Sequence, residues 1–410
     1  MKAYRIQTNT RIKPFQDFVG DVPILNRPLR EVQQEILRDL GIELVQQPPV
    51  NQNYLLISDR VWFTGELIRR FVAHCRETKK TGRMVMEHQG WDNQMSCLQD
   101  SQQGYDIAIV SGEPSFDNGE RIQFDWQLKK SAGFQVHVTM QHAQRELWES
   151  ASVAHHIVHW SHLLRVNQLA IGNLVQKAKL DWQRAGLFKK CLLAFSLLFK
   201  LRSLNRQKIL RRIGRIGKGC TIHPTAVIEA CEIGDNVEIG PYAVLRASVV
   251  GSGTKIEEHT TVNVSVVGKN CQVGRYATAN LCLLFDESLI SHGGGLQGCI
   301  FGRRAFMAIG VQILDLSFGK NVRVEQDDEW VDSGQMFLGG AIGHGAILGN
   351  AVRINYGVSI PNNTIVVAST DDLIRDALSY ISLEQSSHRV YQVRQGKLFP
   401  LGKKNNVNNP

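Results

Sequence analysis

Large apolar residues recur at every seventeenth position in the second half of this chain. The main series is Ile216, Ile233, Val250, Val267, Leu284, Phe301 and Phe318. Two further series keep the same phase. One consists of Cys231, Ser248, Ser265, Cys282 and Cys299, and the other of Cys220, Val237, Thr254, Cys271, Ser288, Ala305 and Val322. A fixed period that persists over six repeats is typical of a solenoid, in which each repeat stacks on the one before it.

Within one period, apolar residues follow one another at steps of six, six and five, as in Ile216, Ile222, Ile228 and Ile233. Three short strands per turn predict a triangular β-coil, with one large side chain pointing inward from each side. Coils of this kind stack at roughly 4.8 Å, so that equivalent side chains lie on one another and the backbone hydrogen bonds run from coil to coil.

This pattern resembles the hexapeptide-repeat acyltransferases. The resemblance implies that residues 216–369 form a left-handed parallel β-helix, although parallel crossovers are ordinarily right-handed. It also implies a homotrimer in which a sugar or nucleotide-sugar acceptor meets its acyl donor in the cleft between two chains. The donor implied is acyl-CoA or an acyl-loaded carrier protein.

Two stretches interrupt the regular coil. Residues 284–296 keep the spacing but contain Phe285, Asp286 and a run of three glycines after His292. Between Phe318 and Ile342 there are 24 residues where 17 would close a coil. We therefore expect the acidic residues 325–334 to leave the coil as a loop.

Residues 1–150 predict an α/β domain. Short alternating or buried apolar runs predict strands at residues 3–7, 53–57, 106–110 and 133–140. Helical apolar spacing predicts helices at residues 29–40 and 65–75, the first ended by Gly41.

The opening of this domain resembles sugar-phosphate nucleotidyltransferases. The matching residues are Asn9–Phe15 and Pro23–Leu29, which stand where the family has a G-x-G-T-R loop and a P-L-L segment. The resemblance implies that Thr10 and Arg11 contact nucleotide phosphates. Gln7 and Asn9 replace the glycines that allow a close backbone approach, and only Asn readily adopts a positive φ.

A second segment of the domain also carries this resemblance. Ser58–Phe63 looks like the family's segment with a magnesium-binding aspartate, which implies that Asp59 binds Mg²⁺. The alternative is that Asp59 is an ordinary loop or helix-capping residue.

The expected order of segments is an α/β domain at 1–150, a helical basic linker at 151–215, the β-helix at 216–369 and a tail at 370–410 with a short helix near 372–380. This order resembles the bifunctional family of N-acetylglucosamine-1-phosphate uridylyltransferases and glucosamine-1-phosphate acetyltransferases.

In the predicted helix at 150–180, His155, His159 and His162 share one face. Packing is the expected role of these histidines, and zinc binding is the alternative.

The net charge of +9 is concentrated in the linker. Residues 182–228 contain eleven basic residues and no acidic one, and residues 187–200 are apolar nearly all round. Because the positive charge is confined to this one segment, we do not expect nucleic acid as a partner. Either a helix buried between the domains or peripheral contact of 187–213 with an anionic membrane fits this segment.

The catalytic candidates follow from the coil. Asn263 stands where the acetyltransferase family has its general base, and an amide cannot take up a proton. We select His292 as base, with Asp286 to orient it and Gly293, Gly294 and Gly295 to supply space and free N–H groups. His259 and His344 are alternative bases, whereas His223 is expected only to pack at a corner.

The function predicted from these observations is acyl transfer to a sugar or sugar nucleotide. The alternatives are a nucleotidyltransferase in which the coil only trimerises the enzyme, and a non-catalytic scaffold that binds sugar nucleotides. Five of the eight cysteines lie on the periodic series and no C-x-x-C pair occurs, which is typical of a reducing cytoplasm. Residues 1–10 lack the apolar stretch of a signal peptide.

Overall fold

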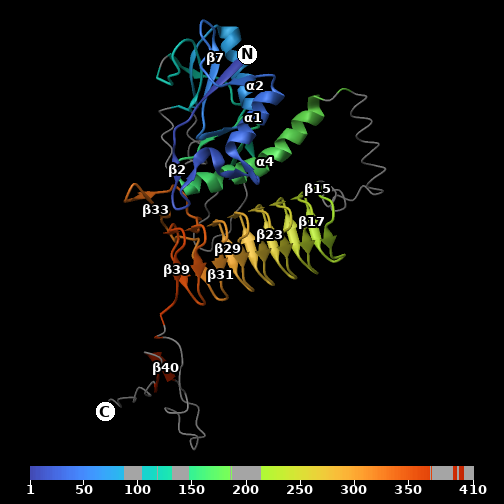
Figure 1. Cartoon of the computed structure of the whole chain (residues 1–410), viewed down its shortest axis with the longest axis vertical. Coiled ribbons are helices and arrows are strands. Elements are labelled where there is room, and N and C mark those ends of the chain that lie inside the picture. Colours follow the sequence, from blue (N-terminus) through green and yellow to red (C-terminus); the bar gives the residue numbers. More distant parts are fainter. Residues whose placement is uncertain are drawn as a thin grey trace, which may run out of the picture.

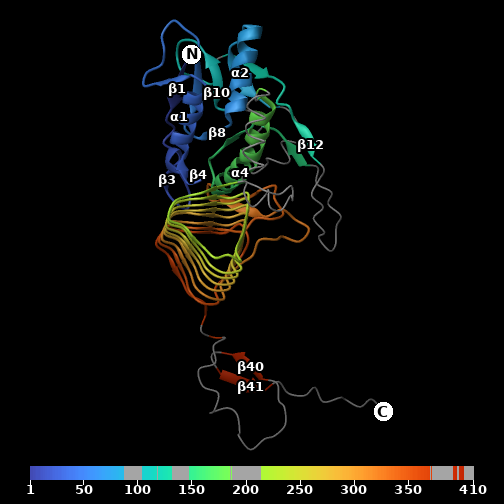
Figure 2. The ribbon, with the colours of Figure 1, turned by 90° about the vertical axis from the view of Figure 1, so that its right-hand side faces the viewer.

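The computed structural model describes residues 1–86, 104–117, 119–131, 147–184, 186, 214–369, 371, 391–394 and 397–400. An α/β domain lies against one side of a triangular coil (Figures 1 and 2). The strand expected at 133–140, the basic segment 187–213 and the short helix at 372–380 lie outside the described residues. Membrane contact through 187–213 therefore stays a prediction.

A six-stranded mixed sheet forms the centre of the α/β domain. Its order is β11 (Glu120–Gln123), β9 (Gly82–Val85), β10 (Ile107–Val110), β7 (Tyr54–Ser58), β1 (Lys2–Ile6) and β6 (Glu43–Val45). Strand β1 runs parallel to β6 and β7, while β10 runs antiparallel to β7 and β9. The strands expected near residues 3–7, 53–57 and 106–110 are confirmed.

Two amphipathic helices, α1 (Leu29–Asp39) and α2 (Gly65–Thr78), pack against the core of this domain. Thr64 caps α2, because its hydroxyl accepts from the Leu67 N–H. Both helices were expected from the sequence. Smaller elements complete the domain: β2 (Arg11–Ile12), β3 (Asp17–Phe18), a 3₁₀ turn (Val19–Asp21), β4 (Pro23–Ile24), β5 (Arg27–Pro28), β12 (Lys129–Ser131) and β13 (Leu147–Glu149).

The expectation of a helix throughout residues 150–180 is wrong at its beginning. Residues Ala154–His156 form strand β14, which pairs antiparallel with β8 (Val61–Phe63). The backbone groups of β8 thereby find partners, as buried backbone groups must. Helix α4 starts only at Trp160 and ends at Arg184.

Three parallel sheets build the coil, one for each side of the triangle seen in Figure 2. The first sheet is β15 (Arg215–Ile216), β18 (Glu232–Ile233), β21 (Val249–Val250), β24 (Val266–Val267), β27 (Leu283–Leu284), β30 (Ile300–Phe301), β35 (Ala341–Ile342) and β38 (Ser359–Ile360). The second is β16 (Thr221–Ile222), β19 (Glu238–Ile239), β22 (Lys255–Ile256), β25 (Gln272–Val273), β28 (Leu289–Ile290), β31 (Phe306–Met307), β36 (Ile347–Leu348) and β39 (Ile365–Val366). The third is β17 (Val227–Glu229), β20 (Val244–Arg246), β23 (Thr261–Asn263), β26 (Thr278–Asn280), β29 (Gly295–Gln297), β32 (Gln312–Ile313) and β37 (Arg353–Ile354).

The register between coils is the predicted one. Ile233, Val250, Val267, Leu284 and Phe301 pair in sequence and are buried in a single column. The small residues at the corners link the coils by hydrogen bonds. The Ser265 hydroxyl, for example, donates to the Asn263 and Ala279 carbonyls and accepts from the Cys282 N–H. The fold is a left-handed parallel β-helix beside a mixed α/β domain.

The periodic series of large apolar residues ends at Phe301, one member earlier than expected. Phe301 pairs with Ile342, so Phe318 is not its successor; Phe318 is 78% exposed, and Val322 also lies outside the coil. The chain leaves the coil after β32 and returns at β35. The expected loop is confirmed in part as a hairpin of β33 (Arg323–Gln326) and β34 (Glu329–Asp332). A further hairpin, β40 (Tyr391–Arg394) and β41 (Lys397–Pro400), follows in the tail.

The α/β domain covers the first sheet of the β-helix. The outward side chains of this sheet are apolar and buried in one core with the domain: Val249, Val266, Leu283, Ile300 and Ala341. Hydrogen bonds fix the contact from both sides. Asn26 donates to the Val267 carbonyl, and His159 contacts the Glu325 carbonyl at 3.1 Å. The residues of this domain that the structure describes do not cover the second and third sheets (Figure 2).

The first interruption of the coil sequence is part of this contact. Phe285 takes the corner position at which neighbouring coils have Gly268 and Gly302, and its ring stacks on Phe15 at 5.1 Å between centroids. His344 packs against both rings. Because phenylalanine at this corner faces the α/β domain, it marks the docking site.

We expect Phe285→Gly to weaken the docking of the domain while leaving the coil intact. Glycine is the residue of the equivalent corners, and loss of a buried aromatic ring costs about 3 kcal/mol. Differential scanning calorimetry should then resolve a separate, earlier transition for the α/β domain. Phe318→Ala, which removes an exposed ring, is the matched control. A single unshifted transition in Phe285→Gly would contradict this view of the contact.

Candidate active site on a corner of the β-helix

Most of the candidate residues in the coil gather at the corner between its second and third sheets. We call this the histidine corner and define it by four turns: Gly240–Tyr242, Glu257–His259, Gly274–Tyr276 and Ser291–Gly293. Each turn follows a strand of the second sheet and precedes one of the third. The structure therefore brings His259, His292 and the three glycines after it onto one edge of the molecule.

Three aromatic rings are stacked along this edge. His259 lies between Tyr242 and Tyr276, with ring centroids 5.0 and 4.9 Å apart and planes inclined by 16° and 7°. His259 thus has a ring on both faces. It serves as a stacking residue, and we do not assign it as the base.

Glu257 is the most enclosed polar residue of the corner. Its side chain is only 10% exposed. One carboxylate oxygen accepts from the Gln272 side chain at 2.7 Å and the other from the Arg275 N–H at 3.2 Å. The carboxylate is therefore held in one position by groups of the next coil.

His292 lies above this carboxylate, two coils further on. Its Nδ1 is 3.6 Å from Glu257 Oε2, and its side chain is 56% exposed. The turn between them carries Gly274, where a Cβ atom would lie 2.9 Å from the Ile290 carbonyl oxygen. The absence of a side chain at Gly274 leaves the carboxylate and the imidazole facing each other.

The expected partner of His292 was Asp286, and this expectation is wrong. Asp286 lies at the corner between the first and second sheets, where it accepts from the Lys269 N–H at 2.7 Å. Five residues, 287–291, which include strand β28, carry the chain to a different corner before His292. The periodicity of the sequence could have predicted Glu257 as the partner. Ser291, the neighbour of His292, lies two periods of 17 residues after Glu257.

Two of the three glycines provide space, and two of the N–H groups that were expected to be free are engaged. A Cβ atom at Gly293 or Gly295 would have no neighbour within 4 Å. The Gly293 N–H, however, donates to the Arg275 carbonyl at 2.7 Å, and the Gly294 N–H to the Ser291 carbonyl. These two N–H groups serve the coil, so they are not available to an oxyanion.

A partly exposed imidazole facing an enclosed carboxylate can act as a general base. The carboxylate orients the ring and stabilises the imidazolium that forms when the outer nitrogen takes up a proton. Arg275 adds positive charge beside the pair, with Nε 2.6 Å from Glu258 Oε1 and 3.7 Å from Glu257 Oε2. The geometry fits proton transfer at an open surface.

The remaining candidates in the coil have structural partners. His344 Nδ1 accepts from the Arg303 N–H, and its Nε2 lies 3.2 Å from Asp17 of the α/β domain. Arg303 forms an ion pair with the same carboxylate. His344 is thus a docking residue. Asn263 donates to Asn280 within the third sheet.

In the α/β domain, Asp59 closes the loop after β1. Its two oxygens both accept from the Thr8 N–H at 3.1 Å, and one accepts from the Thr8 hydroxyl at 2.8 Å. Asn9 has a φ of 55°, as the sequence allowed. Both carboxylate oxygens of Asp59 thus accept hydrogen bonds from Thr8. Magnesium binding by Asp59 remains a prediction.

Thr10 and Arg11 lie in the same loop. The Thr10 hydroxyl is 2.7 Å from that of Thr8, and Arg11 donates to the Gln16 carbonyl and covers the Phe18 ring at 3.8 Å. Nearby, Asp106 is buried. Burial opposes its charged form, but the neighbouring His156 and the Arg60 guanidinium outweigh burial and hold the pKa of this carboxyl below its ordinary value.

The predicted histidine cluster exists, but not on one helix face. His155 is in β14, His159 precedes α4 and His162 is inside it, with ring centroids of His155 and His162 5.2 Å apart. All three are buried. Among the described residues, no three His, Cys, Asp or Glu side chains form a group that could hold a metal ion.

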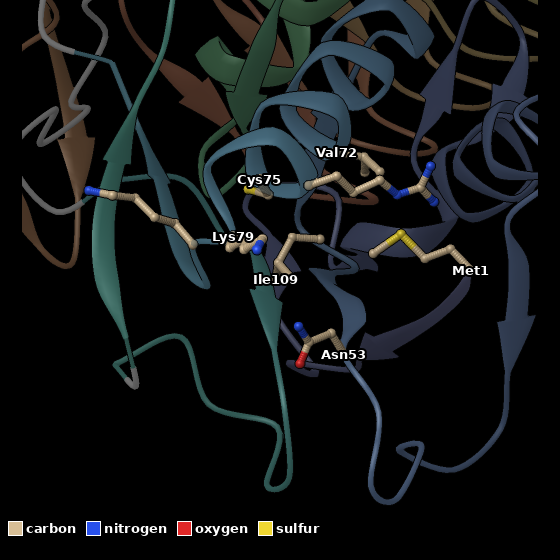
Figure 3. A pocket seen from close by; sticks show the side chains of 8 residues that line it. Met1, Asn53, Val72, Cys75, Lys79 and Ile109 are labelled. Atoms are coloured by element: carbon tan, nitrogen blue, oxygen red, sulfur yellow. The ribbon is translucent and has the colours of Figure 1, made fainter.

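Two of the cavities that are lined by described residues open on the α/β domain. One, of about 440 Å³, is surrounded by Met1, Asn53, Val72, Cys75, Lys79 and Ile109 (Figure 3). Burial raises the pKa of the Cys75 thiol to about 11, so it is protonated at neutral pH and not an activated nucleophile. The other, of about 450 Å³, lies between α1, α2 and α4.

The fold and the corner together define a hexapeptide-repeat β-helix protein with an added α/β domain. A family model described as the GMPPB C-terminal domain matches residues 209–301. Among curated proteins, no sequence is significantly similar to this chain.

The solved structures that are similar to part of this chain include the following three. A hexapeptide transferase family protein from Anaplasma phagocytophilum is 19% identical, with 38% of this chain and 78% of that one covered and a TM-score of 0.20. A putative acetyltransferase from Bacillus cereus is 19% identical, with 37% and 77% covered and a TM-score of 0.16. The UDP-N-acetylglucosamine acyltransferase of Francisella novicida is 15% identical, with 38% and 61% covered and a TM-score of 0.19. At these values the similarities assign no activity. No described helix is both long and apolar enough to cross a bilayer.

His159 gives a test of the packing in this region. Burial lowers the pKa of His159 to about 4, and the hydrogen bond to the Glu325 carbonyl only partly opposes this. The unfolded chain, with an ordinary histidine pKa of about 6.5, takes up a proton that the folded chain does not. Stability that is fully present above pH 6.5 is therefore lost as the pH falls toward 4.

Between about pH 7 and pH 5, we expect His159 to lower the unfolding free energy of the parent chain by on the order of 2 kcal/mol. His159→Gln should not show this part of the decrease. Urea unfolding at both pH values measures this difference. The control is His223→Gln, the same substitution at an exposed position. Equal pH dependence in His159→Gln and the parent chain would contradict the assignment.

Proposed function

We propose that the chain is a transferase that moves an acyl group from acyl-CoA to a sugar or sugar nucleotide, with His292 as general base. The observation that carries the proposal is the pairing of His292 with the enclosed carboxylate of Glu257 on an otherwise open corner. Asp286 has no part in this proposal. The match of residues 209–301 to a β-helix family model supports a protein of this class.

In the proposed reaction, His292 Nε2 removes a proton from an acceptor hydroxyl or amine. The acceptor atom attacks the thioester carbonyl, the C–S bond breaks, and the CoA thiolate takes the proton back from the imidazolium. Glu257 stabilises the imidazolium between these two steps. The Nδ1 to Oε2 distance of 3.6 Å shortens on substrate binding, as catalytic hydrogen bonds commonly do.

The site would be completed by a neighbouring chain of a homotrimer. His292 is 56% exposed, and the first sheet is already covered by the α/β domain. This leaves the second and third sheets, which meet at the histidine corner, as surfaces on which a second chain could cover the reacting groups and exclude water.

The test is the release of free CoA thiol from a set of acyl-CoAs in the presence of sugar and nucleotide-sugar acceptors. We expect His292→Ala to lower kcat/KM by roughly 10² to 10⁴-fold, the usual contribution of a general base. Glu257→Gln keeps the shape but removes the charge, and should lower kcat with little change in KM.

His223→Ala is the matched control, because His223 lies at the same corner in the first coil, where its Nδ1 is 2.8 Å from the Thr225 hydroxyl. It should leave turnover unchanged. Unaltered turnover in His292→Ala would overturn the assignment of the base. The absence of turnover with every donor and acceptor would favour the non-catalytic scaffold.

Nucleotidyl transfer by the α/β domain is a separate prediction with its own test. If Asp59 held magnesium for this reaction, pyrophosphate release from a nucleoside triphosphate and a sugar phosphate would require it. Asp59→Asn should then abolish the release while leaving acyl transfer intact. Pyrophosphate release that persists in Asp59→Asn would exclude this role.

A further inference from the structure

The three stacked rings of the histidine corner occupy a backbone conformation that does not suit them. Tyr242, His259 and Tyr276 have φ values of 60°, 57° and 58°. Bulky residues rarely adopt this left-handed region, because their Cβ atom crowds the following carbonyl oxygen. The same left-handed conformation recurs at the corner between the first and second sheets, at Asn236, Gly253, Asn270, Glu287, Arg304, Gly345 and Asn363.

Packing inside the protein does not account for these rings. Tyr242 is 58% and Tyr276 65% exposed, so both side chains stand out into solvent. Exposed aromatic side chains gathered on one edge of a protein are typical of a binding surface.

The ladder stops beside the catalytic pair. The next position in the series is Gly293, with φ 67°, and the one after it is Gly310, with φ 76°. Neither has a side chain, and a Cβ atom at Gly293 would have no neighbour within 4 Å. The outer face of the Tyr276 ring is therefore open at the level of Gly293, directly next to His292.

An occupant of this level must present a flat, weakly positive face to a phenol ring, whose own face is negative. The axial C–H groups of a pyranose meet this requirement, and its hydroxyl groups extend sideways. His292 belongs to the same coil as Gly293, and Arg275 and Glu258 hold the equivalent positions one and two coils below, so that polar partners line the side of this level. Binding sites commonly combine an apolar platform with a few polar groups in this way.

We propose that Tyr276 is the platform on which the acceptor's pyranose ring stacks, filling the level left open by Gly293. The stacked ring continues the Tyr242–His259–Tyr276 ladder by one further level. A ring held there places one of its hydroxyl or amino groups beside His292. The proposal rests on the proposed function only for the identity of the reacting group, since stacking itself needs no acyl donor.

The platform also predicts which acceptors bind. A gluco-configured ring carries its substituents equatorially and has a flat C–H face on both sides. An open-chain sugar alcohol with the same groups lacks this face. Tyr276 is therefore a specificity-determining residue that selects ring form over open-chain form.

The test is the binding of glucosamine and of its open-chain alcohol, glucosaminitol, to the full chain without donor, measured by calorimetry and by saturation-transfer NMR. We expect glucosamine to bind and glucosaminitol to bind at least tenfold more weakly. Tyr276→Ala should raise the Kd for glucosamine about tenfold, as expected for the loss of one stacking contact. Tyr276→Phe should retain binding.

Two further variants separate stacking from folding. Gly293→Tyr places a ring at the open level in a backbone conformation that Tyr276 already adopts, and should block binding while preserving the fold by circular dichroism. Tyr242→Ala, at the far end of the ladder, should leave the Kd unchanged. Equal binding of ring and open-chain forms, or undiminished binding in Gly293→Tyr, would overturn the proposal.

The outcome for acyl transfer is distinguishable from these results. If glucosamine binding depends on Tyr276 but CoA is never released, the platform stands and the proposed reaction fails. If CoA release depends on His292 but is unaffected in Gly293→Tyr, the reaction stands and the platform fails. A change of oligomeric state in Tyr276→Ala with no change in glucosamine binding per folded chain would make the ladder a subunit contact and overturn the platform.

Discussion

The hydrogen bonds that join each coil to the next fix the position of every side chain in the β-helix. The Glu232 and Gly234 N–H groups, for example, donate to the Ser248 and Val250 carbonyls one coil further on. A slip of one residue would turn each inward side chain outward, so the buried aliphatic column permits a single register. Residues 17 apart therefore become neighbours. This constraint stacks His259 on Tyr276, and over two coils it brings His292 to Glu257.

The α/β domain uses one side of this prism and leaves the proposed site free. Its contact with the first sheet combines an apolar core with Phe15, Phe285 and the Asp17–Arg303 pair. The docking residues Phe15 and Asp17 follow β1 and the loop that Asp59 closes. In open α/β sheets, ligands bind outside the carboxyl ends of the strands. In this chain, the residues that follow the carboxyl end of β1 include Phe15 and Asp17, which contact the β-helix.

Much of the β-helix could be predicted from the sequence, because a period of 17 translates directly into a stack. The series failed only where the chain leaves the coil: Phe318 continues the count in sequence but not in space. The partner of His292 was also missed, because proximity along the chain suggested Asp286 whereas the stack brings Glu257. The role of Phe285 depends on Phe15, 270 residues away, and no periodicity within the coil could reveal it.

The most direct measurement is an experimental electron-density map of the chain crystallised with acyl-CoA. We predict that Glu257 and His292 face each other at the histidine corner, with the thioester carbonyl close to His292 and with Tyr276 on the neighbouring coil below. A map that places Glu257 and His292 on different corners, or acyl-CoA on a surface remote from both, would contradict this prediction.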